Sequence, residues 1–419
     1  MKKYVLWFPV LCLLLLLGGC SAGETSAESD RSSVADGSQS HMAIHEVLTI
    51  GDTPVVLNGK VVSFSGDGWR YDVDSATLTM DSLFISRCVE NEDGFSALYC
   101  SGDLNILLSG ESTIDISASH SDVSSSAVYV LGQLTISGTG KLNVKGASAA
   151  EDSVGIYALR GLTISGADVT ASGGTGSRSM GVVCGSGLWL EKDGALQASG
   201  GTAKQFSAGV YTGQGLVSVQ NAVMTANGGA ITGENGSDLT DDARSCGIWS
   251  ASQVSIHAGD VTAAGGEADA GENFDAFSDG IYAVGSVEID ASSRVAVNGG
   301  NARGREAYSR GICCFSGNVE VHDGVLNGYG GSVTGSRLAV SCGAYVENGG
   351  FYAYENGAEV TLAGGSAEVS LETGKAYANG IHAAAGDVGL GAGNAAVIGG
   401  RITGGSGNAE SIVSARPAA

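Results

Sequence analysis

The chain has 419 residues, of which 68 are glycine and only 3 are proline, and its formal net charge is −23. Glycine without a three-residue period excludes a collagen-like chain, the 43% share of hydrophobic residues argues against general disorder, and the acidic charge excludes the basic footprint of nucleic-acid-binding proteins. Glycine mixed with small polar and β-branched residues is typical of short strands and tight turns, so we expect an all-β fold.

The first residues have the pattern of an export signal. Lys2 and Lys3 provide a positive start, and residues 5–17 form an apolar run that is too short for a permanent membrane helix. Gly18-Gly19-Cys20 then resembles a bacterial lipobox. The pattern predicts a lipoprotein signal peptide at 1–19, lipid attachment at Cys20, and an extracytoplasmic protein that contacts the membrane through its lipid anchor only. An ordinary signal peptide with an incidental cysteine is the alternative.

The next segments lead into the folded part. Residues 20–43 are rich in Ser, Ala, Gly, Asp and Glu, which predicts a flexible tether. Residues 44–95 hold apolar stretches that match no later segment. We expect them to form an N-terminal cap with the first strands, because an open end of a stacked sheet is prone to pair with other chains.

Residues 96–400 repeat one unit. "GIYALRGLTISGADVTASGG" starts at Gly155, and related segments start at Gly181, Gly209, Gly247, Gly280 and Gly311. Each unit holds three short stretches with period-two alternation, as in Ile156, Leu162 and Val169 against their polar neighbours. One unit cannot bury its apolar face alone, so we predict a right-handed parallel β-helix (β-solenoid) with three strands per rung, about ten rungs and a C-terminal tail at 401–419. An antiparallel sandwich or propeller is the alternative.

Two further features recur in the units. A Gly-Gly pair closes each one, which suggests turns with positive φ, and the unequal spacing after it predicts loops along one edge. A serine stands two residues before each starting glycine, and we expect its hydroxyl to bond local backbone. These serines are Ser153, Ser179, Ser207, Ser245, Ser278 and Ser309.

An aromatic column is the main candidate for ligand binding. The outward position after each Gly-Ile is aromatic in six of eight units, with Val183 and Cys313 as exceptions. Exposed rings along a flat sheet suit the apolar faces of sugars, although aromatic residues also favour strands for stability alone. The predicted carbohydrate-binding residues are Tyr99, Tyr129, Tyr157, Tyr211, Trp249 and Tyr282.

Acidic residues suggest a possible metal site. Glu288 and Glu320 occupy equivalent outward positions in successive units, with Asp290 and His322 close by, and Ca²⁺ would relieve the repulsion between the carboxylates. Solvated acids are the alternative. Acidic inserts also precede an insert with Arg303, Arg305 and Arg310, which predicts exposed ion pairs or an arginine cluster that grips the carboxylates of an acidic polysaccharide.

The cysteine pattern fits neither a disulfide framework nor a zinc site. Seven cysteines follow Cys20, an odd number without a CxxC motif. We place four of them at the inward small-residue position and leave a bond between the last two open. These four are Cys100, Cys184, Cys314 and Cys342.

The unit 155–174 and its neighbours, together with "DGWRYDVDSATLTM" at 67–80, resemble a bacterial family of exported, repetitive carbohydrate-binding domain-containing lipoproteins. These are related to the polygalacturonate-binding, pectate-lyase-like β-helix family, and the resemblance covers roughly residues 65–400. It implies a right-handed parallel β-helix, polysaccharide binding with an acidic, pectin-like ligand as a candidate, and calcium as a candidate cofactor. The family's Asp-Gly-Ile turn is kept only at Asp279-Gly280-Ile281.

The leading hypothesis is therefore a lipid-anchored surface protein that binds polysaccharide without catalysis. An adhesin or structural spacer is the alternative. A polysaccharide lyase needs a base, and the middle units place no Lys or Arg outward on their strands. A glycoside hydrolase needs two facing carboxylates, for which Glu288 and Glu320 are the candidates.

Overall fold

The computed structural model describes residues 46–91, 94–232, 242–354, 357–391 and 394–414, and these residues form strands and no helix. They all belong to one compact unit, 41–419. The predicted signal peptide 1–19, Cys20 and the tether 20–43 lie outside the described residues. Within the described ranges, no helix is long and apolar enough to cross a membrane.

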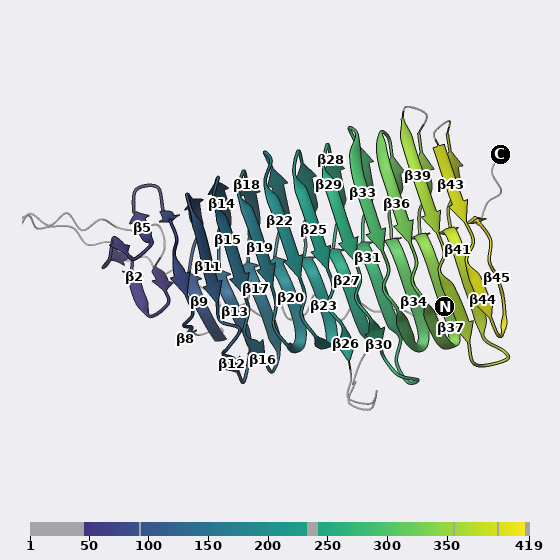
Figure 1. The fold of residues 1–419 in the computed structure, drawn as a ribbon, viewed down its shortest axis with the longest axis horizontal. Coiled ribbons are helices and arrows are strands. Elements are labelled where there is room, and N and C mark those ends of the chain that lie inside the picture. The colour runs from purple at the N-terminus through teal and green to yellow at the C-terminus, as the bar shows by residue number, and fades with distance from the viewer. Residues whose placement is uncertain (1–45, 92–93, 233–241, 355–356, 392–393, 415–419) are drawn as a thin grey trace, which may run out of the picture. The chain divides into compact units, whose positions relative to one another are not determined.

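Three parallel sheets wind into a β-solenoid of about ten turns, as predicted (Figure 1). One turn contributes one strand to each sheet, as in β17 (Asp152–Ala158), β18 (Gly161–Ser165) and β19 (Asp168–Ser172). Each strand pairs in parallel with its counterpart in the next turn, so residues at equivalent positions lie on one another in columns. The prediction of three strands per turn is confirmed.

We call the three sheets A, B and C in the order in which a turn visits them. The long strands of sheet A are β9 (Gly94–Cys100), β13 (Ser125–Val130), β17, β20 (Gly176–Cys184), β23 (Ala203–Thr212), β27 (Ala243–Ser250), β31 (Ala276–Ala283), β34 (Ala302–Cys314), β37 (Val333–Val346) and β41 (Lys375–Ala383). Sheet B is built from β4 (Ser65–Gly66), β5 (Trp69–Asp72), β6 (Thr77–Met80), β10 (Leu104–Leu108), β14 (Gln133–Gly138), β18, β21 (Leu188–Glu191), β24 (Val217–Gln220), β28 (Val254–His257), β32 (Val287–Asp290), β35 (Val319–Val321), β38 (Phe351–Ala353) and β42 (Val388–Leu390).

Sheet C contains β7 (Phe84–Ile85), β11 (Glu111–Asp115), β15 (Lys141–Lys145), β19, β22 (Ala195–Ser199), β25 (Val223–Asn227), β29 (Asp260–Ala264), β33 (Ser293–Asn298), β36 (Gly324–Tyr329), β39 (Ala358–Ala363) and β43 (Asn394–Ile398). Short strands at the edge of sheet A are β26 (Ile231–Thr232), β30 (Ala268–Asp269), β40 (Ser366–Val369), β44 (Arg401–Thr403), β45 (Ser406–Asn408) and β46 (Ile412–Ser414), and β12 (His120–Ser121) pairs with β16 (Ser148–Ala149).

The main core fills the space between the three sheets. Ile156, Leu162 and Val169 point inward and are at most 2% exposed, and equivalent positions in other turns are again apolar. Each apolar side chain therefore packs on a similar one above and below, which gives the continuous burial that a single turn cannot reach.

The two ends of the solenoid differ. At the N-terminal end, β1 (Val47–Ile50) pairs with β9 in antiparallel fashion, and β2 (Thr53–Leu57), β3 (Lys60–Val61) and β8 (Val89–Asn91) add further antiparallel pairs. These strands interrupt the parallel stack at its first edge. At the other end, β44, β45 and β46 continue the parallel pairing as far as Ser414, so the tail predicted from residue 401 is in fact part of the solenoid.

The Gly-Gly pairs serve a different purpose from the one expected. None of the pairs at 173–174, 200–201, 228–229, 265–266, 299–300 and 330–331 has a positive φ. Instead, a Cβ on Gly201 would overlap the carbonyl oxygen of Gly174 in the preceding turn, and one on Gly200 would overlap Oγ of Ser207. Glycine is required here because successive turns approach too closely for a side chain.

The repeated serines hold these close turns together. The Ser207 hydroxyl donates to the carbonyl of Gly201 at 3.0 Å and accepts the N–H of Gly229, one turn further on, at 2.8 Å. The same pair of bonds recurs at Ser179 and Ser245, and the six serines are fully buried. The predicted bonding to backbone is confirmed, and it extends from each turn to the next.

The inserts at the edge of sheet A fold into a small second core. Ala203, Ile231 and Ala268 meet alanines and valines from the neighbouring turns there, away from the main core. The unequal spacing between units thus produces both loops and added buried structure along this edge.

Candidate functional site

The outward side of sheet A carries the predicted aromatic column. Parallel pairing aligns Tyr99 with Tyr129 and Tyr129 with Tyr157, and the alignment continues through Val183 to Tyr211, Trp249 and Tyr282. All six predicted aromatic residues are half-buried. The predicted column is therefore present, and sheet A positions it through its strand register.

The rings of this column stack on one another. The ring centroids are 5.9 Å apart for Tyr99–Tyr129, 4.7 Å for Tyr129–Tyr157 and 4.1 Å for Trp249–Tyr282, with planes within 15° of parallel. Stacked rings turn their faces toward each other, so within the column their edges face outward. Contact with a ligand would therefore involve ring edges and hydroxyl groups, whereas the sequence suggested ring faces.

The column is longer than the sequence indicated. Cys313 aligns with Tyr345, and Tyr345 aligns with His382, whose ring stacks on it with centroids 5.1 Å apart. The loose repeats after residue 330 concealed this continuation. Burial raises the pKa of the Tyr345 hydroxyl, and the hydrogen bond that this group donates to Glu347 at 2.6 Å raises it further.

A second aromatic column runs beside the first. It lies five residues earlier in each strand and holds Phe206, Phe277, Tyr308 and Tyr377, with Arg244 and Val340 at the positions between them. Phe206 makes edge-to-face contacts with Tyr211 and Trp249, with centroids 5.7 and 5.6 Å apart, so the two columns touch. We call these two columns together the aromatic face. The period-two pattern in the residues before each Gly-Ile is the sequence signal of this second column.

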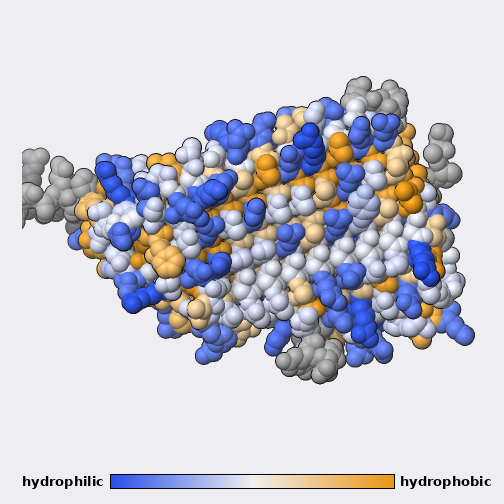
Figure 2. All heavy atoms as spheres, in the orientation of Figure 1, coloured by the Kyte–Doolittle hydropathy of each residue, from blue (hydrophilic) through white to orange (hydrophobic). Residues whose placement is uncertain are grey.

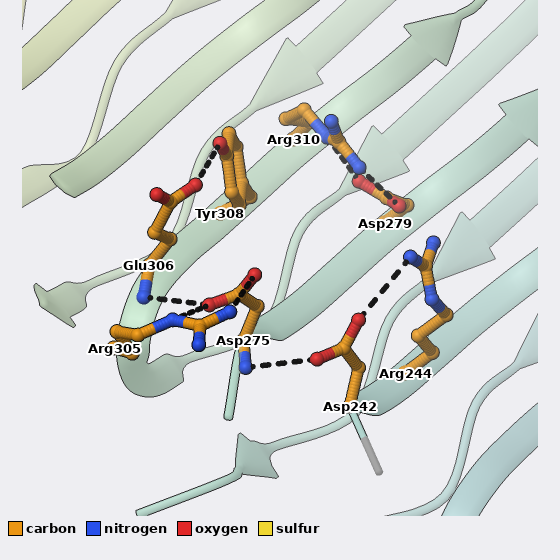
Figure 3. Close-up of polar contacts among 8 residues, drawn as sticks. All are labelled: Asp242, Arg244, Asp275, Asp279, Arg305, Glu306, Tyr308 and Arg310. Atoms are coloured by element: carbon orange, nitrogen blue, oxygen red, sulfur yellow. Dashed lines mark hydrogen bonds and ion pairs between the residues drawn. The ribbon is translucent and has the colours of Figure 1, made fainter. Parts of the chain in front are cut away.

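A buried ion pair lies at the base of the aromatic face. Arg310 donates to both carboxylate oxygens of Asp279, from Nε at 2.6 Å and from a terminal nitrogen at 2.8 Å, and the two side chains are 5% and 1% exposed (Figure 3). Phe277, Tyr308 and Tyr345 surround the guanidinium at 5.2–5.7 Å from their centroids. Arg310 therefore supplies the positive charge that Asp279 faces at the one Asp-Gly-Ile segment.

The other arginines of this insert are also paired. Arg305 forms two bonds of 2.9 Å with Asp275, whose side chain is 5% exposed (Figure 3). Arg303 lies 3.5 Å from Asp269. The expectation of exposed pairs holds for Arg303 and is wrong for Arg310, because its side chain points under the aromatic face. Internal partners thus occupy the three arginines that could have gripped an acidic ligand.

The predicted metal ligands divide into two groups on sheet B. Glu288 and Glu320 are aligned, and Nε2 of His322 lies 4.0 Å from Glu288 and 3.3 Å from Glu320. Asp290 instead contacts His257 at 2.6 Å. Gln253 and Asn318 donate to the two glutamates at 2.9 Å each. Among the residues that the structure describes, no group of three or more His, Cys, Asp or Glu is arranged to hold a metal ion.

The cysteine placement needs one correction. Cys100, Cys184 and Cys314 occupy the inward column, as expected. Cys342 instead aligns with Arg310, directly before Gly343. The segment around Cys342 is offset from the regular unit, so the repeat pattern predicted the wrong position for this cysteine. All seven described cysteines have free thiols, so Cys314 and Cys342 are not paired.

Figure 2 shows one side of the solenoid, on which hydrophobic residues form a band along the long axis among scattered hydrophilic ones.

Comparison of the chain with models of protein families, with curated proteins and with solved structures finds no match. The family resemblance therefore stays a prediction.

Proposed function

We propose that this protein is an exported surface protein, lipid-anchored at Cys20, that binds an extended polysaccharide without catalysis along the aromatic face. The supporting observation is the column of half-buried rings on aligned positions of sheet A from Tyr99 to His382, interrupted only at Val183 and Cys313 among the described residues. Neighbouring strands of a sheet are about 4.8 Å apart, so the face offers similar groups at regular steps to a polymer that also repeats.

The stacked rings form a rigid binding surface. Each ring is held by its neighbours, as Tyr129 is held between Tyr99 and Tyr157, so little side-chain freedom is lost when a ligand arrives. The ring edges carry the positive part of the aromatic quadrupole and suit the oxygen atoms of sugars, and the tyrosine hydroxyls can exchange hydrogen bonds with sugar hydroxyls. This binding mode needs no exposed ring face.

The same stacking supports a second candidate, a structural spacer or adhesin in which the columns only stabilise the rod. Cross-strand aromatic pairs stabilise a sheet with or without a ligand. The two functions differ in what removal of the hydroxyl groups does, because a phenylalanine keeps the stack and loses the polar tip.

The first experiment is a binding screen. The soluble form that begins at Ser21 is incubated with insoluble neutral and acidic polysaccharides, with and without calcium, and the bound fraction is measured. Retention on one class supports the binder, and release of sugars or of unsaturated ends over time would point to catalysis instead. If no polysaccharide retains the protein, the spacer is the better account.

A further inference from the structure

A cavity of about 380 Å³ lies at the start of the long strands of sheet A, near the C-terminal end of the solenoid. Its lining includes Glu306, Arg337, Leu338, Leu371, Thr373 and Lys375. Its volume is at the small end of the range for ligand pockets. The turn 371–374, which forms one side, belongs to the part of the sequence where the repeat is least regular.

The cavity opens on the same side of sheet A as the aromatic face. Glu306, Leu338 and Lys375 are aligned on β34, β37 and β41. They stand two residues before Tyr308, Val340 and Tyr377, and residues two apart on a strand point to the same side.

Two positive charges of the cavity have no ion-pair partner among the residues that the structure describes. Arg337 and Lys375 are exposed, and neither forms an ion pair with a carboxylate of the described residues. Arg303, Arg305 and Arg310 of the adjacent insert are each paired with an aspartate. In a chain with a net charge of −23, two unpaired cations beside one cavity favour an anionic ligand.

The other residues that line the cavity indicate which functional groups the ligand carries. Leu338 and Leu371 are apolar walls, and Leu371 is 48% exposed. Thr373 offers an exposed hydroxyl, and the Glu306 carboxylate, which accepts a bond from Tyr308 at 3.1 Å, can accept a further hydroxyl. A cationic pair, two apolar walls and two polar groups match a molecule with one carboxylate, several hydroxyls and C–H surface.

We propose that this cavity binds a hydroxylated organic carboxylate about the size of one sugar ring, with Arg337 and Lys375 as the carboxylate-binding residues. Charge-assisted hydrogen bonds from two cations are the strongest interactions available at this site. The site goes beyond the proposed polymer binding, since it can take a free acid as well as an acidic residue of a chain.

Titration calorimetry of the soluble form with sodium glucuronate, glucose and sodium sulfate tests this proposal. We expect saturable glucuronate binding that is at least tenfold tighter than binding of glucose or sulfate. The double variant R337Q/K375Q should weaken glucuronate binding at least tenfold, whereas K204Q, which removes an exposed cation elsewhere on sheet A, should leave it unchanged. Absence of saturable binding, equal binding of sulfate, or an unaffected double variant would overturn the proposal.

A variant that fills the cavity tests separately whether the ligand binds inside it. Thr373→Phe fills the cavity from an exposed turn and keeps both cations, so it should also abolish glucuronate binding while the melting temperature stays close to wild type. Tyr129→Phe with Tyr157→Phe, far from the cavity, should leave glucuronate binding unchanged. Glucuronate binding without retention on any polysaccharide would refute the proposed polysaccharide binding and support the proposed carboxylate site.

Discussion

Asp279 and Arg310 form a two-bond ion pair between successive turns, buried beneath the aromatic face. The three preceding turns carry Met180, Ala208 and Cys246 at the same position, so the pair replaces the apolar contacts made there. Burial alone would lower the pKa of the Arg310 guanidinium, but the facing Asp279 carboxylate raises it well above its usual range. The Arg310 guanidinium therefore stays protonated in spite of its burial.

Removal of one partner of this pair should destabilise the protein strongly. Asp279→Ala or Arg310→Met leaves an uncompensated buried charge, which costs about 3–5 kcal/mol of unfolding free energy. The double variant carries the residue types found at Ala208 and Met180, and we expect it to return close to wild-type stability. Urea denaturation of the three variants measures this, and a double variant as unstable as the single ones would contradict the account.

Ser207→Ala should reveal the contribution of the serine ladder. The change leaves the N–H of Gly229 and the carbonyl of Gly201 without the hydroxyl that joins them, and each buried unsatisfied group costs about 1–3 kcal/mol. Ser186→Ala, at an exposed position between sheets, is the matched control and should change stability by less than about 0.5 kcal/mol. Equal melting temperatures for the two variants would show that the ladder is dispensable.

The thiols should differ in reactivity according to burial. Burial raises the pKa of Cys342 and of Cys100 to about 12, so almost no thiolate is present at pH 8. Cys88 is the only described cysteine that is not fully buried. Brief alkylation of the folded soluble form, followed by mass spectrometry, should modify Cys88 first, and the six others should require denaturant. Rapid modification of Cys342 in the folded state would contradict its placement.

His382 should make stability depend on pH. Burial lowers its pKa below the usual 6.5, while Glu347 acts in the opposite direction. Asn379 donates to its Nδ1 at 3.1 Å and accepts the N–H of Glu410 through its oxygen, which fixes the neutral ring. Because the unfolded chain binds the proton more readily, this contribution is complete above pH 6.5 and is lost as the pH falls below it.

We therefore expect the melting temperature of wild type to fall between pH 7.5 and 5.5 by more than that of His382→Gln. Tyr345 stacks on the imidazole, and because burial raises the pKa of its hydroxyl, it does not titrate in this range. A parallel decline in both proteins would assign the pH dependence to other groups.

The carboxylate pair on sheet B gives a test of the calcium prediction. His322 lies between Glu288 and Glu320 and lessens their repulsion when it is protonated. His322→Ala should destabilise the protein by less than about 1 kcal/mol, since the site is partly exposed. If Ca²⁺ can bridge the glutamates, millimolar calcium restores the loss, and Glu288→Gln with Glu320→Gln removes the response. No effect of calcium on His322→Ala would refute the predicted metal site.

The fold was predictable because one signal repeats. Alternation at Ile156, Leu162 and Val169 recurs with the same register, and stacking of successive turns buries such faces. The role of the Gly-Gly pairs was not predictable, because a positive φ and a close approach of two turns both require glycine. The ring orientation of Tyr129 was equally hidden, because it depends on the neighbours above and below.

The site was predictable only in part, because some of its contacts join residues that are far apart in the sequence. The six aromatic positions follow from the repeat, but the pairing of Asp279 with Arg310 spans an insert of irregular length. The cavity beside Arg337 and Lys375 depends on the turn 371–374, which has no counterpart in the regular units. Local pattern carries no information on such contacts between inserts.

The measurement that tests the central claim most directly is a binding isotherm on the polysaccharide that retains the wild type. Wild type is compared with Tyr129→Phe/Tyr157→Phe, and Tyr329→Phe, an exposed tyrosine on sheet C, is the control. We expect the double variant to keep the wild-type melting temperature and to bind at least tenfold more weakly, with the control unchanged. Equal binding by all three proteins would contradict a binding role for the aromatic face.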